Sequence, residues 1–66
     1  MFILTTDALG NRCVINSDYI ASVLQEDKCV NIDMAKGKNI FLQFKSKDTA
    51  IDMFNYIADN VRGVRK

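Results

Sequence analysis

Apolar and polar residues alternate with a period of two in residues 29–34 and again in residues 39–44. Successive side chains of a strand point to opposite sides, so this pattern predicts two strands with one apolar face each. The apolar positions are Val30, Ile32, Met34, Ile40, Leu42 and Phe44.

The short link between these strands contains Gly37, and the alternation constrains its geometry. A two-residue loop would pair Ile32 with Phe41 and put the two apolar faces out of phase. A three-residue loop pairs Ile32 with Ile40 and gives Gly37 the left-handed position that such loops contain. We predict the second register, because a slip of one residue would turn a whole apolar face to water.

The N-terminal segment predicts a β-hairpin. Residues 2–6 are rich in strand-forming side chains, Gly10 and Asn11 form a turn signal, and residues 12–15 read as a second strand. Several loop lengths give tolerable pairings, so the register of this hairpin stays open. Ile3 is apolar, but it lies on the side of its strand that we expect to stay exposed if only one face is buried.

The stretch Asn16-Ser17-Asp18 interrupts two apolar runs. Asn, Ser and Asp side chains hydrogen-bond nearby backbone groups and so favour turns and caps. We therefore predict a corner with a short turn at 17–19, followed by a strand over about residues 21–25 and a turn at 26–28. The alternative is a binding site at Asn16 or Asp18.

The C-terminal segment predicts an amphipathic helix. Ser46 is a suitable N-cap and Gly63 a suitable residue just beyond the C-terminal end. The apolar residues recur at steps of three and four: Ala50, Ile51, Phe54, Ile57, Ala58 and Val61. The opposite face carries Asp48, Asp52, Asn55, Asp59 and Arg62, which form either a solvated surface or an acidic docking face for a basic partner.

These elements predict an α+β fold. We expect a small curved antiparallel sheet of about five strands in a meander, either open or closed into a partial barrel. One C-terminal helix packs on it. The chain has 66 residues and forms one domain, residues 1–66. A chain this short buries only ~60% of the surface that its unfolded form exposes, and small domains usually add a disulfide, a metal or a partner chain.

Composition narrows the setting in which the chain works. With 48% hydrophobic and 26% charged residues it is globular, and its net charge of +1 supplies no general attraction for nucleic acid or anionic lipid. Two cysteines without a CxxC pair fit a reducing cytosol. No apolar stretch approaches the length of a secretion signal or a membrane span. We expect a cytoplasmic protein with no membrane association.

The sequence carries little that could catalyse a reaction. It has no histidine for acid–base work or zinc binding, and its three glycines do not cluster into a phosphate-binding loop. Cys13 and Cys29 lack an obvious base partner and read as strand residues. We predict a protein that is not an enzyme, with no cofactor, no metal and no small-molecule substrate.

Surplus apolar residues indicate a binding partner instead. Phe41 lies on the otherwise polar side of its strand, and Met53 and Tyr56 widen the helix stripe beyond what one contact layer needs. Small sheets also expose strand edges that another chain can extend. We predict a non-catalytic regulatory or adaptor module that binds another protein or itself as a homo-oligomer, such as a homodimer, through Phe41, Met53 and Tyr56.

Nucleic-acid binding is the alternative function. Lys36 and Lys38 lie at the tip of a predicted hairpin, Arg65 and Lys66 end the chain, and Phe41 could stack on a base. The near-zero net charge and the acidic helix face argue against it. Lysines at hairpin tips also serve to prevent edge-to-edge aggregation.

The order of motifs resembles the FlbD-like family of small bacterial proteins of flagellar and swarming motility. The shared pattern covers about residues 3–61 and runs from a glycine turn to a C-terminal helix. Its residues here are Gly10, Val14-Ile15-Asn16, Tyr19-Ile20, Val23, Ile32, Met34, Gly37-Lys38, Ile40 and Leu42. Leu9, Lys45 and Lys47 depart from the family's tendencies. The resemblance implies the same architecture and a cytosolic, non-catalytic protein.

Overall fold

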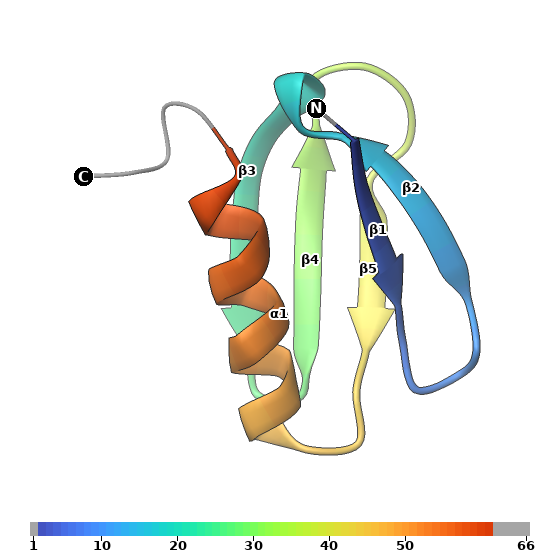
Figure 1. The fold of residues 1–66 in the computed structure, drawn as a ribbon, viewed down its shortest axis with the longest axis vertical. Coiled ribbons are helices and arrows are strands. Elements are labelled where there is room, and N and C mark those ends of the chain that lie inside the picture. The colour runs from blue at the N-terminus through green and yellow to red at the C-terminus, as the bar shows by residue number, and fades with distance from the viewer. Residues whose placement is uncertain (1, 62–66) are drawn as a thin grey trace.

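The computed structural model describes residues 2–61, which form five strands, one short 3₁₀ helix and one α-helix (Figure 1). In chain order these are β1 (Phe2–Thr6), β2 (Arg12–Asn16), η1 (Ser17–Tyr19), β3 (Ile20–Glu26), β4 (Cys29–Met34), β5 (Ile40–Gln43) and α1 (Lys47–Asp59).

The strands form two sheets. β1 pairs with β2, and β3, β4 and β5 form a three-stranded sheet in that order, with every pair antiparallel. The α+β class, the five antiparallel strands and the C-terminal helix are confirmed. The single curved sheet is wrong, because no ladder joins β2 to β3 within the described residues.

The corner between β2 and β3 explains this division. The Asn16 side chain accepts a hydrogen bond from the Asp18 backbone amide at 3.0 Å and caps η1. The Ile20 amide closes the same turn on the Ser17 carbonyl. The predicted corner is confirmed, and its 3₁₀ turn carries the chain from one sheet to the other.

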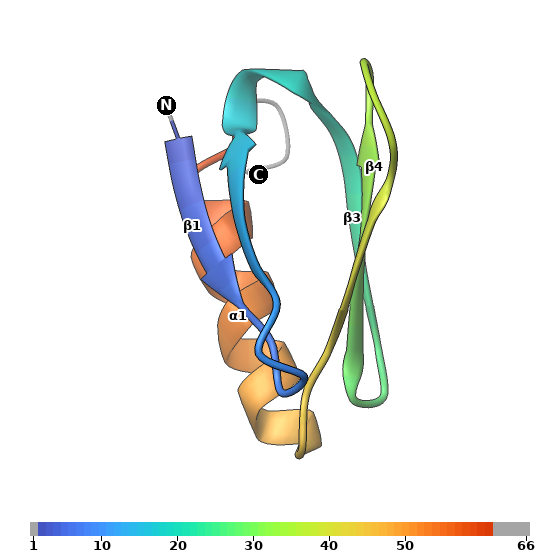
Figure 2. The same cartoon turned by 90° about the vertical axis from the view of Figure 1, so that its right-hand side faces the viewer.

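The two sheets and the helix form two layers. Figure 2 shows the three-stranded sheet on one side, and the β1–β2 hairpin with α1 on the other. The helix packs against β3 and β4. The core lies between the layers and contains Ile3, Ile15, Ile20, Val30, Ile32, Leu42, Phe44, Ala50, Ile57 and Val61.

The predicted register of the β4–β5 hairpin is confirmed. Ile32 lies opposite Ile40, and Gly37 has a φ of +85°, in the left-handed region. The predicted three-residue loop is wrong, because residues 35–39 separate β4 from β5. Asn39, which the alternation places in the second strand, lies in this loop, where its exposed side chain accepts a hydrogen bond from the Met34 amide at 3.0 Å.

The prediction for Ile3 is wrong. Ile3 lies opposite Ile15, and both are buried in the core, while Phe2 and Leu4 point outward. Residues 2–4 are all apolar, so their own pattern does not show which of them faces the core. The pairing with β2 decides which side is buried, because Ile3 lies opposite buried Ile15, which stands between polar Asn16 and exposed Val14.

The helix begins where the sequence predicts. Ser46 Oγ accepts a hydrogen bond from the Thr49 amide at 3.2 Å, which satisfies one of the free amides of the first turn. Ala50 and Ile57 face the core, and the acidic residues of the opposite face are exposed. Arg62 and Gly63 lie outside the described residues.

Candidate protein-binding surface

Three large apolar side chains cover the outer side of the β1–β2 hairpin. Phe2 is 70% exposed, Leu4 60% and Val14 62%. The ladder places Leu4 directly opposite Val14, and Phe2 on the same side of β1. The hairpin is an outer layer with the core on its other side, so no further layer covers this side within the described residues (Figure 2).

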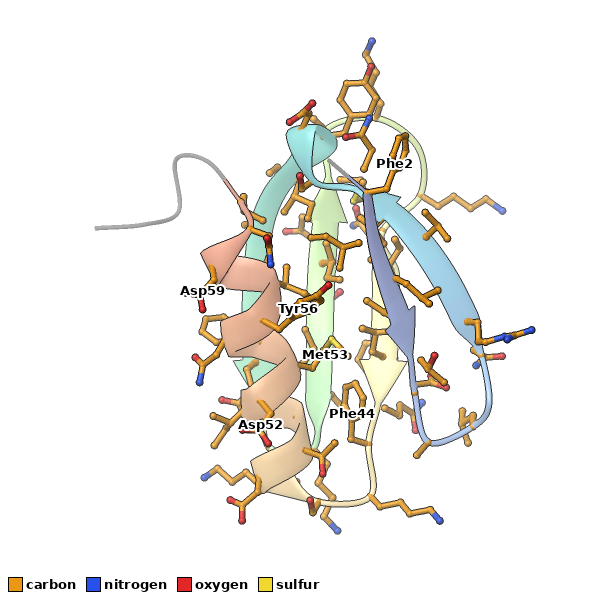
Figure 3. All side chains as sticks on the ribbon, viewed as in Figure 1. Phe2, Phe44, Asp52, Met53, Tyr56 and Asp59 are labelled. Atoms are coloured by element: carbon orange, nitrogen blue, oxygen red, sulfur yellow. The ribbon has the colours of Figure 1, made fainter. Side chains whose placement is uncertain are left out.

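The helix extends this surface. Tyr56, which is 46% exposed, points from α1 toward β1 (Figure 3). Phe2, Leu4, Val14 and Tyr56 together form the hairpin–helix face. Asp52 and Asp59 lie one helical turn on either side of Tyr56 and are exposed. They form an acidic border on the side of this face away from β1.

The outer side of the three-stranded sheet is more polar. Leu24, Asn31 and Phe41 form one row across β3, β4 and β5, and Phe41 is 54% exposed. The neighbouring row is polar, because Ser22 Oγ donates to Asp33 Oδ2 at 2.9 Å. The Asn31 side chain therefore separates the two exposed apolar side chains, Leu24 and Phe41. The hydrogen-bonded Ser22–Asp33 pair borders their row.

The predicted protein-binding residues do not form one site. Phe41 lies on the outer sheet side, whereas Met53 and Tyr56 belong to the opposite layer with α1. Phe41 and Tyr56 are exposed as expected, and Met53 is half-buried against the core. Sequence reasoning missed Phe2, Leu4 and Val14. The sequence signal that could have found them is Val14. It is the one apolar residue on the side of β2 that also carries Arg12 and Asn16.

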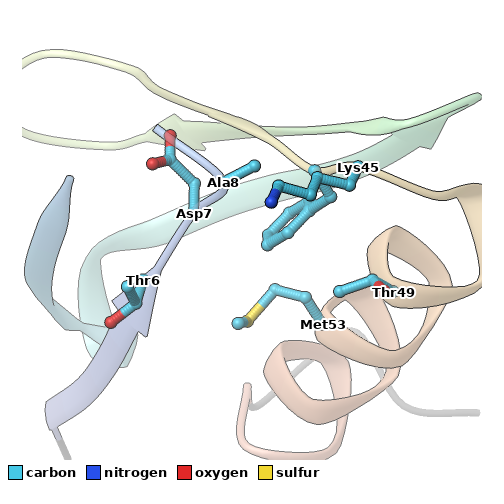
Figure 4. Close-up of a pocket in the computed structure, with 7 residues that line it drawn as sticks. Thr6, Asp7, Ala8, Lys45, Thr49 and Met53 are labelled. Atoms are coloured by element: carbon cyan, nitrogen blue, oxygen red, sulfur yellow. The ribbon is translucent and has the colours of Figure 1, made fainter. Parts of the chain in front are cut away.

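A pocket of about 280 Å³ opens beside Met53, between the end of β1 and the start of α1 (Figure 4). Its lining consists of Thr6, Asp7, Ala8, Phe44, Lys45, Thr49 and Met53. The Met53 side chain lies in the space between the β1 end and the helix, and Lys45 lies near its rim. The lining holds one carboxylate, Asp7, whose ionisation bears on whether the pocket can carry out acid–base chemistry.

Asp7 is occupied by structural hydrogen bonds. Its Oδ1 accepts from the amides of Leu9 and Asn11, each at 3.0 Å, and its Oδ2 accepts from the Gln43 amide at 3.5 Å. Burial alone would raise the pKa of Asp7, but these bonds and one from the Asn11 side chain outweigh it and hold the pKa below its ordinary value. A carboxylate held ionised in a turn is a poor proton donor.

The basic residues of the alternative site are divided. Lys36 Nζ lies over the Tyr19 ring, 5.2 Å from its centre, which joins the β4–β5 loop to the η1 corner. Lys38 is exposed in the same loop. Arg65 and Lys66 lie outside the described residues.

Residues 2–61 contain neither a disulfide nor a cluster of metal-binding side chains. Cys13 and Cys29 are free and half-buried. No three side chains of the metal-binding types come together there. Within the same residues, no helix has the length and apolar character needed to cross a membrane.

Comparison with known proteins found no matching family model, no similar curated protein and no similar solved structure.

Proposed function

We propose that this chain is a cytoplasmic, non-catalytic regulatory or adaptor module that binds another protein or a second copy of itself. The observation that carries the proposal is the hairpin–helix face. Single exposed hydrophobic side chains are normal on protein surfaces, whereas a contiguous patch of large ones is typical of an interaction surface. Phe2, Leu4 and Val14 are neighbours of this kind.

The chemistry of the pocket supports a non-catalytic role. Its carboxylate, Asp7, is committed to the turn that it holds, and the pKa shift keeps it ionised rather than poised for proton transfer. The resemblance of the motifs to the FlbD-like family points the same way, and membership of that family is part of this proposal.

Affinity capture tests the proposed function. The tagged wild-type chain should retain a protein partner or a second copy, and Leu4→Ser should lose it. Asn31→Ser, a polar change on the exposed outer sheet side, is the control and should retain the same partner. The proposal fails if the wild-type chain is monomeric and retains no protein.

Nucleic-acid binding is a second candidate function. The observation in its favour is the contact of Lys36 with Tyr19, because a cation beside an aromatic ring suits a phosphate and a base together. Lys38 lies in the same loop. We rank it second, since the net charge is +1 and Asp18 lies in the adjacent corner.

A further inference from the structure

We propose that the hairpin–helix face packs against the same face of a second copy, around a two-fold axis that runs along β1. This inference rests on the proposed function and names its partner and surface. It assigns Phe2, Leu4, Val14 and Tyr56 to the apolar centre of the interface, with charged residues at its border.

The charges on the two borders of this face are complementary. On the helix side, Asp52 and Asp59 flank Tyr56. On the hairpin side, exposed Arg12 lies in β2, the strand farther from the helix (Figures 1 and 3). A surface with opposite charges on its two borders matches its own rotated copy, because the rotation places each border against the other.

The charged groups also lie at matching heights along the proposed axis. Arg12 is paired with Thr6, and Thr6 lines the same pocket as Thr49 and Met53 of the helix. Asp52 adjoins Met53 in the helix, which places it toward the same end of β1 as Arg12 (Figure 3). A two-fold axis parallel to β1 keeps these levels unchanged, so the Arg12 of each copy meets the Asp52 of the other.

The shape of the molecule favours association through one of its two broad faces, of which the hairpin–helix face is one (Figure 2). The principal extents are 27 × 25 × 16 Å, and Figure 1 looks down the shortest of them onto the hairpin and the helix. A stable interface needs ~800 Å² from each partner. That is roughly one sixth of the 4622 Å² surface of the chain, and a broad face can supply it more readily than a narrow side.

A second copy also meets the need of so small a domain for added stabilisation. The two cysteines are free, and no metal-binding cluster is present among residues 2–61. Association is the remaining common means of stabilising a chain of this length. The outer sheet side is less suited to it, because Asn31 separates Leu24 from Phe41 and the next row is polar.

Sedimentation equilibrium on the full chain tests this interface. We expect the wild type at twice its mass of 7.5 kDa. Leu4→Ser alters both halves of a symmetric interface, so it should raise the dimer dissociation constant about 100-fold. Phe41→Ser, a comparable change on the outer sheet side, should alter it less than about two-fold. Circular dichroism checks that both variants fold.

A charge exchange tests the two-fold arrangement without removing apolar side chains. Arg12→Asp alone and Asp52→Arg alone should each weaken self-association about ten-fold, because each homodimer then opposes like charges. Mixing the two variants should restore dimers, since the mixed pair places opposite charges at both contacts. Restoration in the mixture cannot arise from a contact within one copy.

Three results would overturn this inference. They are a wild-type monomer at about 1 mM, a dimer that dissociates on Phe41→Ser but persists on Leu4→Ser, and a charge mixture that stays monomeric. The first result leaves the proposed function standing if the monomer still captures another protein. The second leaves it standing on the outer sheet side. Failure of the proposed function is distinct and requires that neither a second copy nor another protein binds.

Discussion

The Ala8 amide donates a hydrogen bond to the carbonyl oxygen of Gln43 at 2.8 Å. This bond joins the turn after β1 to the last residue of β5, and so links the two sheets. The Asp7 carboxylate reinforces the link, because its Oδ2 accepts from the Gln43 amide. These polar contacts at one end of the molecule therefore add to the core packing of Ile3 and Ile15 in holding the hairpin over the three-stranded sheet.

Replacement of Asp7 should show how much this link contributes and at which pH. The folded-state pKa of Asp7 is lowered, so its contribution to stability is present above the unfolded-state pKa and is lost as pH falls through the folded-state pKa. Asp7→Asn should lower the urea midpoint near neutral pH. The difference from wild type should shrink from about pH 5 downward.

The control for this prediction is Asp59→Asn, which removes an exposed carboxylate from the helix. Its urea midpoint should follow the wild-type pH dependence, because exposed carboxylates contribute little to stability. Equal midpoints for Asp7→Asn and wild type near pH 7 would show that the carboxylate does not support the fold.

Truncation of a core side chain should unfold much of the population. Ile57 is fully buried between the helix and the sheets, and Ile57→Ala should cost about 2–5 kcal/mol of unfolding free energy. A small domain has a stability of about the same size. Tyr56→Ala, at the exposed neighbouring position, should cost about 1 kcal/mol or less in dilute monomer. Chemical denaturation compares them, and similar losses for both would contradict the assigned core.

Gly37 in the β4–β5 loop has room for a side chain, but its left-handed backbone conformation should make substitution unfavourable. A Cβ atom built there meets no other atom within 4 Å, but φ is +85°. Gly37→Ala should therefore cost about 1–2 kcal/mol from backbone strain alone. Gly37→Asn should cost less, because Asn adopts this region more readily. Urea titration measures both, and a neutral Gly37→Ala variant would mean that the loop adopts another conformation.

The lysines of this loop separate the two candidate functions. If the chain acts through its apolar surface, Lys36→Glu combined with Lys38→Glu should leave protein binding within about two-fold of wild type. Fluorescence anisotropy with single-stranded RNA and duplex DNA should then show no binding that falls steeply with salt. Strong salt-dependent binding, lost in the lysine variant, would favour the nucleic-acid function.

The sequence determines the local structure of this protein. The N-cap at Ser46, the corner after Asn16 and the pairing of Ile32 with Ile40 each depend on residues close together in the chain. Caps, turns and alternating faces follow from short-range backbone geometry, so their residues can be recognised without knowledge of the fold.

Only the tertiary structure decided how those elements are arranged in layers. Periodicity indicates which residues lie on one face of a strand or helix, but not which layer that face meets. The apolar run at residues 2–4 has no phase of its own, and only its pairing with β2 buries Ile3 and exposes Leu4. In the same way, the sequence predicts that Phe41 and Tyr56 both bind a partner, but it does not show which layer each belongs to. Phe41 lies on the exposed outer side of β5, whereas Tyr56 lies on α1 in the opposite layer. Bonds such as Ala8 to Gln43 join the two sheets across 35 positions of sequence.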